Sequence, residues 1–185
     1  MSKELIYRQW AMPSRHTFEI KPIAELLDTV LAGRSEILDP FAGRSERGTI
    51  RNDLAHGGKD AVDFLDDCIA KGVQADAVLL DPPYSPRQMS ECYKSVGLKK
   101  GMNGTQNARL YKECKQRLDA LLRPGGVAVT CGWNSAGFDA KYGYERIVTL
   151  LVSHGGAHND TIVVVQRKPT PPKPQAAAAT ATSRP

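Results

Sequence analysis

The sequence lacks the features that mark membrane, secreted and metal-cluster proteins. No apolar run approaches the ~18 residues needed to cross a bilayer, and the opening stretch MSKELIYRQW has no apolar signal-peptide core. The four cysteines are scattered and form no CxxC pair, so neither a zinc cluster nor a disulfide framework is expected. These absences predict a cytoplasmic protein with no membrane contact and no metal, whose reduced and mostly buried thiols are Cys68, Cys92, Cys114 and Cys131.

Apolar residues that can form a folded core occur along nearly all of the chain. The exception is the stretch 169–185, which is rich in Pro, Ala and Thr and has no large apolar side chain. We therefore predict one domain over residues 1–168, followed by a disordered tail over 169–185. The formal net charge of +5 is compatible with a polyanionic partner, although it does not by itself identify one.

The remaining pattern alternates between strand-like and helix-like segments. Helical apolar stripes are predicted around residues 23–31, 61–69 and 110–122, and strands over 36–39, 49–53, 77–80, 127–131, 147–152 and 161–166. Such alternation predicts an α/β, Rossmann-like fold with a mostly parallel sheet, helices on both faces and an antiparallel strand pair at the C-terminal end. In sheets of this kind, ligands bind at the carboxyl ends of the strands.

The first of two informative strand ends is the segment Asp39-Pro40-Phe41-Ala42-Gly43. Small residues and a glycine after a strand let the backbone approach a ligand closely, and the acid can accept a hydrogen bond from an ammonium or hydroxyl group. An ordinary strand-to-helix turn explains this segment equally well when it is considered alone.

The second informative strand end is Asp81-Pro82-Pro83-Tyr84, which follows an apolar strand. The two prolines stiffen the chain and remove two backbone donors. A carboxylate, a carbonyl and an aromatic ring are thereby held within four residues. This set suits a planar aromatic amine: the Asp81 carboxylate and the Pro82 carbonyl can accept the amine hydrogens, and Tyr84 can stack on the ring.

The tetrad resembles the catalytic motif of the amino-methyltransferases that modify adenine-N6 in DNA. The segment 39–43 resembles the S-adenosylmethionine motif of that family, and residues 15–23 (RHTFEIKPI) resemble its other cofactor motif. The resemblance extends over roughly residues 14–167. It implies the class I methyltransferase fold, S-adenosylmethionine as cofactor, and direct methyl transfer without a cysteine nucleophile.

The resemblance also implies a role for individual residues. In the cofactor site, the methionine end would contact Asp39, Phe41, Ala42 and Gly43 and be covered by Thr17, Lys21 and Pro22, while Asp53 would hold the ribose and Asp60 the adenine. The catalytic residues would be Asp81, Pro82, Pro83 and Tyr84. Simpler interpretations stay open for three of these: Asp53 as a solvated acid, Asp60 as a helix N-cap and Lys21 as a surface lysine.

Three features depart from the family pattern. Ser45 stands where the family has a glycine, the cofactor motif precedes the catalytic one, and no target-recognition domain is evident. The stretch 85–109 is the room that remains for substrate contacts, and we interpret it as a mobile basic loop in which Arg87, Lys99 and Lys100 bind the substrate backbone. The size suggests a phage-like enzyme, of the restriction-modification kind, that reads few bases alone and works with a recognition partner or as a homodimer.

Several alternatives remain open at this point. The acceptor could be RNA instead of DNA, or the chain could be a degenerate relative that binds nucleic acid without catalysis. A small-molecule or protein acceptor is disfavoured because the tetrad begins with Asp81 and not with Asn. Trp10 is expected to be packed, and the group His154, His158 and Asp160 is expected to be a surface turn and not a metal site.

Overall fold

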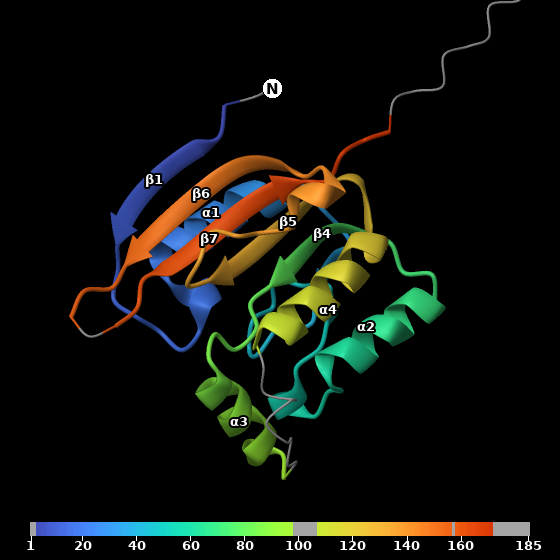
Figure 1. The fold of residues 1–185 in the computed structure, drawn as a ribbon, viewed down its shortest axis with the longest axis horizontal. Coiled ribbons are helices and arrows are strands. Elements are labelled where there is room, and N and C mark those ends of the chain that lie inside the picture. The colour runs from blue at the N-terminus through green and yellow to red at the C-terminus, as the bar shows by residue number, and fades with distance from the viewer. Residues whose placement is uncertain (1–2, 98–106, 157, 172–185) are drawn as a thin grey trace, which may run out of the picture.

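A computed structural model describes residues 3–97, 107–156 and 158–171, and its centre is one seven-stranded sheet (Figure 1). The strands are β1 (Leu5–Trp10), β2 (Ile37–Asp39), β3 (Ile50–Arg51), β4 (Ala75–Leu80), β5 (Leu122–Gly132), β6 (Glu145–Ser153) and β7 (Thr161–Arg167). The helices are α1 (Lys21–Leu31), α2 (Ala61–Ala70), α3 (Pro86–Ser95) and α4 (Asn107–Leu121).

The sheet has the order β1-β6-β7-β5-β4-β2-β3. The pairs β2–β3, β2–β4, β4–β5 and β1–β6 are parallel, whereas β7 runs antiparallel to both of its neighbours. This arrangement confirms the predicted mostly parallel sheet with an antiparallel element at the C-terminal end.

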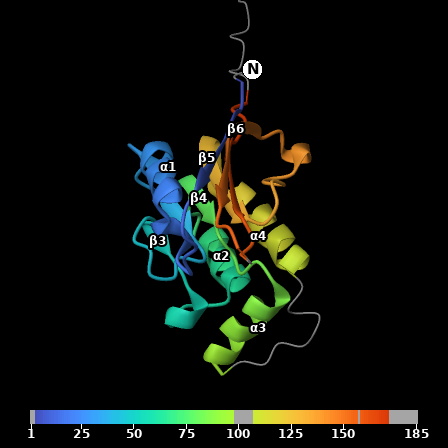
Figure 2. The same ribbon diagram turned by 90° about the vertical axis from the view of Figure 1, so that its left-hand side faces the viewer.

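Helices cover both faces of the sheet, as predicted. Figure 2 shows the sheet edge-on, with α1 on one side and α2 and α4 on the other. The alternation along β4 fits this layering, because Ala77 and Leu79 pack with the α1 core while Val78 and Leu80 pack with the α2–α4 core. Among the described residues, no helix is long and apolar enough to cross a membrane.

Local signals in the sequence explain where the helices begin and end. Pro22 stands in the first turn of α1, where its missing N–H is not needed, and Gly33 takes a positive φ of 74° just after the helix. The Asp60 carboxylate caps α2 by accepting from the Val62 N–H at 3.0 Å. The four cysteines are free, and all but Cys92 are buried.

Two elements were not predicted from the sequence. Residues 5–10 form the edge strand β1, which is exposed along most of its length, so its pattern carries no clear alternation. Trp10 on this strand is 65 % exposed, so the expectation that it is packed was wrong. The predicted loop 85–109 was also partly wrong, because residues 86–95 form the helix α3.

His154 is buried, which corrects its interpretation as part of a surface turn. Its Nδ1 lies 2.9 Å from the carbonyl oxygen of Ala11, and its Nε2 lies 2.9 Å from Thr161 Oγ1. The ring therefore joins the segment after β1 to the start of β7, a structural role that occupies both nitrogens.

The predicted tail begins at residue 169, and residues 172–185 lie outside the described part of the chain. The domain boundary at residue 168 therefore stays a prediction.

A buried glutamine holds the loop that follows β5. Gln166 is 2 % exposed, accepts from the Phe138 N–H at 2.6 Å and donates to the Phe138 carbonyl at 3.2 Å. Gly137 precedes Phe138 with a φ of 59°, and a Cβ there would lie 2.2 Å from the Gln166 Oε1. The loop therefore has no space for a side chain at position 137.

We expect Gly137→Ala to lower the free energy of unfolding by about 2 kcal/mol or more, because it combines backbone strain with loss of the Gln166 contacts. Gly33→Ala is the matched control, since its φ is 74° but nothing lies within 4 Å of the added Cβ. Strain alone should cost about 1 kcal/mol there. Urea unfolding measures both, and equal losses would contradict the steric argument.

Candidate functional site

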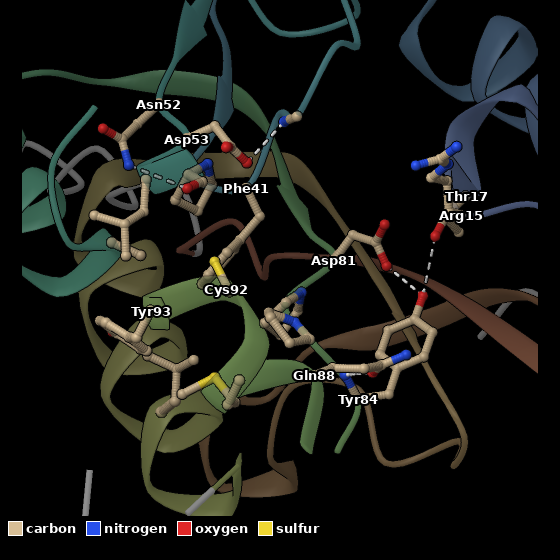
Figure 3. Close-up of a pocket in the computed structure, with 18 of the residues that line it drawn as sticks. Arg15, Thr17, Phe41, Asn52, Asp53, Asp81, Tyr84, Gln88, Cys92 and Tyr93 are labelled. Atoms are coloured by element: carbon tan, nitrogen blue, oxygen red, sulfur yellow. Dashed lines mark hydrogen bonds between the residues drawn. The ribbon is translucent and has the colours of Figure 1, made fainter. Parts of the chain in front are cut away.

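The carboxyl ends of β2 and β4 meet because these two strands pair in parallel. A cavity of about 290 Å³ opens beside them, and Figure 3 shows its lining. A second hollow of about 760 Å³ lies next to the first and shares Arg15, Thr17, Phe41, Gly43 and Asp81 with it. The cavity is thus lined by residues from five stretches of the chain: 15–17, 40–43, 52–61, 81–93 and residue 110.

The turn after β2 brings backbone to the edge of the cavity. The Ala42 N–H donates to the Asn52 carbonyl at 2.9 Å, and the Ser45 N–H donates to the Ala42 carbonyl at 2.8 Å. Gly43 has a φ of 55°, and nothing lies within 4 Å of where its Cβ would be. Among the described residues, only glycines have a positive φ, so the backbone at Ser45 does not require the glycine that the family pattern has there.

Asp39, at the end of β2, is fully buried, and one of its two carboxyl oxygens makes a hydrogen bond. Its Oδ1 accepts from the Phe41 N–H at 3.1 Å, whereas its Oδ2 is buried without a hydrogen-bond partner among the described residues. Burial raises the pKa of this carboxyl to about 8, partly offset by the Phe41 N–H and reinforced by the neighbouring Asp81 and Asp53. At neutral pH this carboxyl group is therefore mostly protonated, and a cationic or hydrogen-bond-donating ligand beside it would favour its ionised form.

Asp53, which follows β3, is hydrogen-bonded to the turn that follows β2. Its Oδ2 accepts from the Gly43 N–H at 3.0 Å, and its Oδ1 lies 2.8 Å from His56 Nδ1 in the short 3-10 helix η2 (Leu54–His56). The carboxylate also lines the cavity, as Figure 3 shows. It is therefore placed to accept a hydrogen bond from a ligand while it holds the glycine turn.

The tetrad after β4 forms one wall of the cavity. The Tyr84 hydroxyl donates to Asp81 Oδ1 and lies 3.4 Å from Thr17 Oγ1, as the dashed lines in Figure 3 show. Burial raises the pKa of Asp81 to about 6, and the hydrogen bonds from Tyr84 and Thr17 lower it. The carboxylate is thus a partly buried acceptor that lines the cavity and already binds a hydroxyl donor.

Helix α3 holds the tetrad in place and lines the cavity, which the sequence analysis missed. The Gln88 side chain accepts from the Tyr84 N–H at 2.7 Å and from the Ser85 N–H at 3.2 Å. Met89, Cys92 and Tyr93 add to the same wall. A signal was present, because Ser85 and Gln88 form a capping box with Pro86 at the first helical position.

The structure brings most of the predicted site residues to this cavity or to the hollow beside it. The residues that line one or both are Thr17, Phe41, Ala42, Gly43, Asp53, Asp81, Pro82, Pro83 and Tyr84. Arg15 and Lys59 line the cavity too, although neither was predicted for the cofactor site. Asp39 lies behind this lining, where it bonds the turn.

Four predicted residues are placed away from the cavity lining. The Lys21 side chain is 86 % exposed and lies 4.0 Å from Glu25, and Pro22 is buried in the first turn of α1. The Asp60 carboxylate caps α2 and accepts from the Tyr93 hydroxyl. Arg87 is exposed on α3 and pairs with Glu91 at 2.8 Å.

Two further predicted substrate residues, Lys99 and Lys100, lie outside the described residues. Their role, like that of Arg87, stays a prediction.

The charges around the cavity suit a ligand that carries both signs. The carboxylates of Asp53 and Asp81 line it and the buried carboxyl group of Asp39 lies behind it, while Arg15 adds a cation and Lys59, which also lines the cavity, is paired with Asp67. Ala61, Met89 and Leu110 provide an apolar surface on which a flat ring can pack.

No protein-family model and no curated protein sequence matches this chain, whereas solved structures do. SMU.776, a candidate methyltransferase solved in complex with SAH, is 10 % identical, with a TM-score of 0.53 over 77 % of this chain and 47 % of that one. TrmN from Thermus thermophilus is 17 % identical, with a TM-score of 0.42 over 80 % and 49 %. The N-methyltransferase NodS from Bradyrhizobium japonicum WM9, in complex with S-adenosyl-L-homocysteine (SAH), is 12 % identical, with a TM-score of 0.43 over 80 % and 86 %.

The chain has the class I methyltransferase fold, as its sheet order and the likeness to SMU.776 show. It spans about half the length of SMU.776 and TrmN. At such low identity the likeness concerns the fold, and the chemistry has to be argued from the cavity.

We expect the free energy of unfolding to fall as the pH rises in the wild type, and to fall less in the Asp39→Asn variant. The folded pKa of about 8 lies above the unfolded value of about 3.9, so the folded state holds a proton that the unfolded state releases between these values. The free energy of unfolding should therefore fall across this window by an amount on the order of several kcal/mol. Asn cannot ionise, so urea unfolding at pH 4.5 and pH 8 should show a smaller fall for the variant; parallel curves would contradict the raised pKa.

Proposed function

We propose that this protein is an S-adenosylmethionine-dependent methyltransferase that methylates the exocyclic N6 amine of adenine in DNA. The observation that carries the proposal is the placement of Asp81: a partly buried carboxylate at the tip of β4, which lines the same cavity as Asp53 and the Gly43 turn. A hydrogen-bond acceptor thereby stands next to a pocket that suits a nucleoside.

The residues present fit the proposed cofactor. The carboxylates of Asp53 and Asp81 line the cavity and favour a ligand with an ammonium and a sulfonium group, and Arg15 can face a carboxylate. Asp53 has further lone pairs for the ribose hydroxyls, beyond those used by Gly43 and His56. The apolar surface of Ala61, Met89 and Leu110 can pack against the adenine ring.

S-adenosylmethionine, when bound, supplies a methyl group on a positively charged sulfur. The chain has to supply a position for the acceptor amine and a means to make it nucleophilic. The Asp81 carboxylate and the Pro82 carbonyl would accept hydrogen bonds from the two amine N–H groups, which localises the nitrogen lone pair that is otherwise spread into the ring. As the N–CH3 bond forms, the S–CH3 bond would break, and the proton that the amine loses would pass to Asp81 or to solvent. Holding the two reactants in line provides the remaining rate enhancement.

The hydroxyl of Tyr84 supports this role for Asp81. It donates to the Oδ1 atom that the proposal assigns to the acceptor amine, so the site already binds a donor there. An entering base would replace this hydroxyl at Asp81, and the ring of Tyr84 could then stack on the base.

The acceptor amine of a duplex is enclosed in the base stack, so the base has to flip out or be single-stranded already. The decisive experiment supplies tritiated S-adenosylmethionine with separate pools of DNA and RNA and identifies the labelled nucleoside. N6-methyl-2′-deoxyadenosine from the DNA pool supports the proposal. Label in the RNA pool alone corrects the substrate, and the absence of label in both pools overturns the assignment of a nucleic-acid acceptor.

We expect Asp81→Asn to lower kcat for methyl transfer by at least about 100-fold, because the amide is a weaker acceptor and can turn a donor toward the amine. Affinity for SAH should stay within about threefold, since the variant keeps the shape of the site. Asp63→Asn, an exposed acid on α2, is the matched control. Retention of more than about a tenth of the wild-type rate would remove Asp81 from the catalytic group.

We expect Asp53→Asn to weaken SAH binding by about tenfold, the effect of losing one charge-assisted hydrogen bond. The asparagine oxygen can still accept from the Gly43 N–H, so the turn should persist. Isothermal titration calorimetry compares this variant with the Asp63→Asn control. An unchanged affinity would mean that Asp53 serves the turn and not the ligand.

A further inference from the structure

A separate cleft of about 530 Å³ lies beside the cofactor cavity, at the end of β5. Its walls are the first half of α4 and the loop 132–139, and among the described residues Tyr84 alone lines both this cleft and the cofactor cavity. Asp81 does not line this cleft. Whatever occupies it therefore lies next to the reacting amine, on the other side of Tyr84.

An aromatic pair forms one end of the cleft. The ring centroids of Tyr84 and Trp133 are 5.8 Å apart, with an interplanar angle of 65°. Trp133 is 43 % exposed although it comes directly after the buried end of β5. A large apolar ring left open inside a cleft provides a surface on which a planar group can stack.

Two lysines of α4 form another wall. Lys112 is exposed, whereas Lys115 is 9 % exposed, with its Nζ 5.8 Å from the centre of the Tyr111 ring. Among the described residues neither lysine has an ion-pair partner within 4.0 Å. Burial lowers the pKa of Lys115, and Asp139 opposes this shift from across the cleft.

The single acid of the cleft does not neutralise these lysines. The Asp139 carboxylate lies 3.8 Å from the Lys141 ammonium, so its negative charge is divided between Lys141 and the lysines of the cleft. Within the described part of the chain, the cleft therefore combines an open indole with two lysines that form no ion pair with a carboxylate, one of them partly desolvated. An anion bound there would compensate the buried charge of Lys115.

We propose that this cleft binds the nucleotide next to the acceptor base in a single-stranded segment of nucleic acid, with its base on Trp133 and its phosphate on Lys112 and Lys115. The inference deepens the proposed function and rests on it for the position of the acceptor at Asp81. Stacking on an aromatic ring combined with a cationic contact to the backbone is the usual way in which proteins hold single strands. Since every base has a flat face, the cleft should tolerate different neighbouring bases.

The chain offers a direct optical test, because it has two tryptophans, Trp10 and Trp133. In the Trp10→Phe protein, fluorescence reports on Trp133 alone. Titration with single-stranded DNA or RNA of about 12 nucleotides should quench this signal at saturation. In the matched Trp133→Phe protein, which keeps only the exposed Trp10, the same strands should leave the signal unchanged.

Affinity provides the second readout. Trp133→Ala should bind these strands about tenfold more weakly, as expected for one lost stacking contact, whereas an abasic strand of equal length should bind both proteins alike. Lys115→Met keeps the apolar stem and should reduce the slope of log K against log salt by about 0.7, the value for one phosphate contact on a single strand. Lys141→Met, outside the cleft lining, should leave the slope unchanged.

The outcomes separate this inference from the proposed function. If single strands quench Trp133 and the cleft variants bind them more weakly, but no nucleic acid is methylated, then nucleotide binding in the cleft is supported and the proposed methyl transfer is overturned. Methyl transfer with unchanged affinity in Trp133→Ala and Lys115→Met would uphold the reaction and overturn the cleft. Equal quenching by a poly-glutamate peptide would also overturn it, since the cleft would then be a site for acidic protein segments. The DNA and RNA strands identify which sugar the cleft accepts.

Discussion

The parallel pairing of β2 with β4 is the constraint from which the rest of the site follows. The register Leu38↔Val78 ends both strands at the same edge of the sheet. Asp39 and the tetrad that begins at Asp81 are thereby held side by side, and the charge of Asp81 adds to the effect of burial in raising the pKa of Asp39. The same edge exposes the glycine turn and the rigid tetrad, so a ligand that enters there meets acceptors from two strands.

The acidic side chains at this edge destabilise the folded protein when no ligand is bound, and they favour the binding of a ligand. Burial is the main cause of the raised pKa values of about 8 for Asp39 and about 6 for Asp81. A protein selected for stability alone would have hydrophobic residues there, because buried unpaired carboxyl groups destabilise the folded state. Their presence is understandable if a cationic ligand and an amine donor complete the interactions that the chain leaves open.

The two clefts divide the site around a shared tyrosine. Tyr84 contacts the Asp81 carboxylate through its hydroxyl and Trp133 through its ring, so it belongs to both the proposed reacting centre and the proposed nucleotide cleft. Helix α3 fixes its backbone through Gln88, and the loop anchored by Gln166 follows Trp133. The acceptor side therefore depends on elements that surround the sheet and not on the sheet alone.

The sequence by itself determined the layers of the fold and the two strand ends that carry polar groups, because apolar periodicity and residues such as Pro82 and Gly43 act locally. It could not show that Lys21 points to solvent or that residues 5–10 extend the sheet as an edge strand, since exposure depends on neighbours distant in the chain. The tertiary structure likewise decided that His154 is buried and that Trp133 and Lys115 line the same cleft. Local sequence specifies which groups end each strand, whereas packing alone decides which of those groups share a cavity and how far each is removed from water.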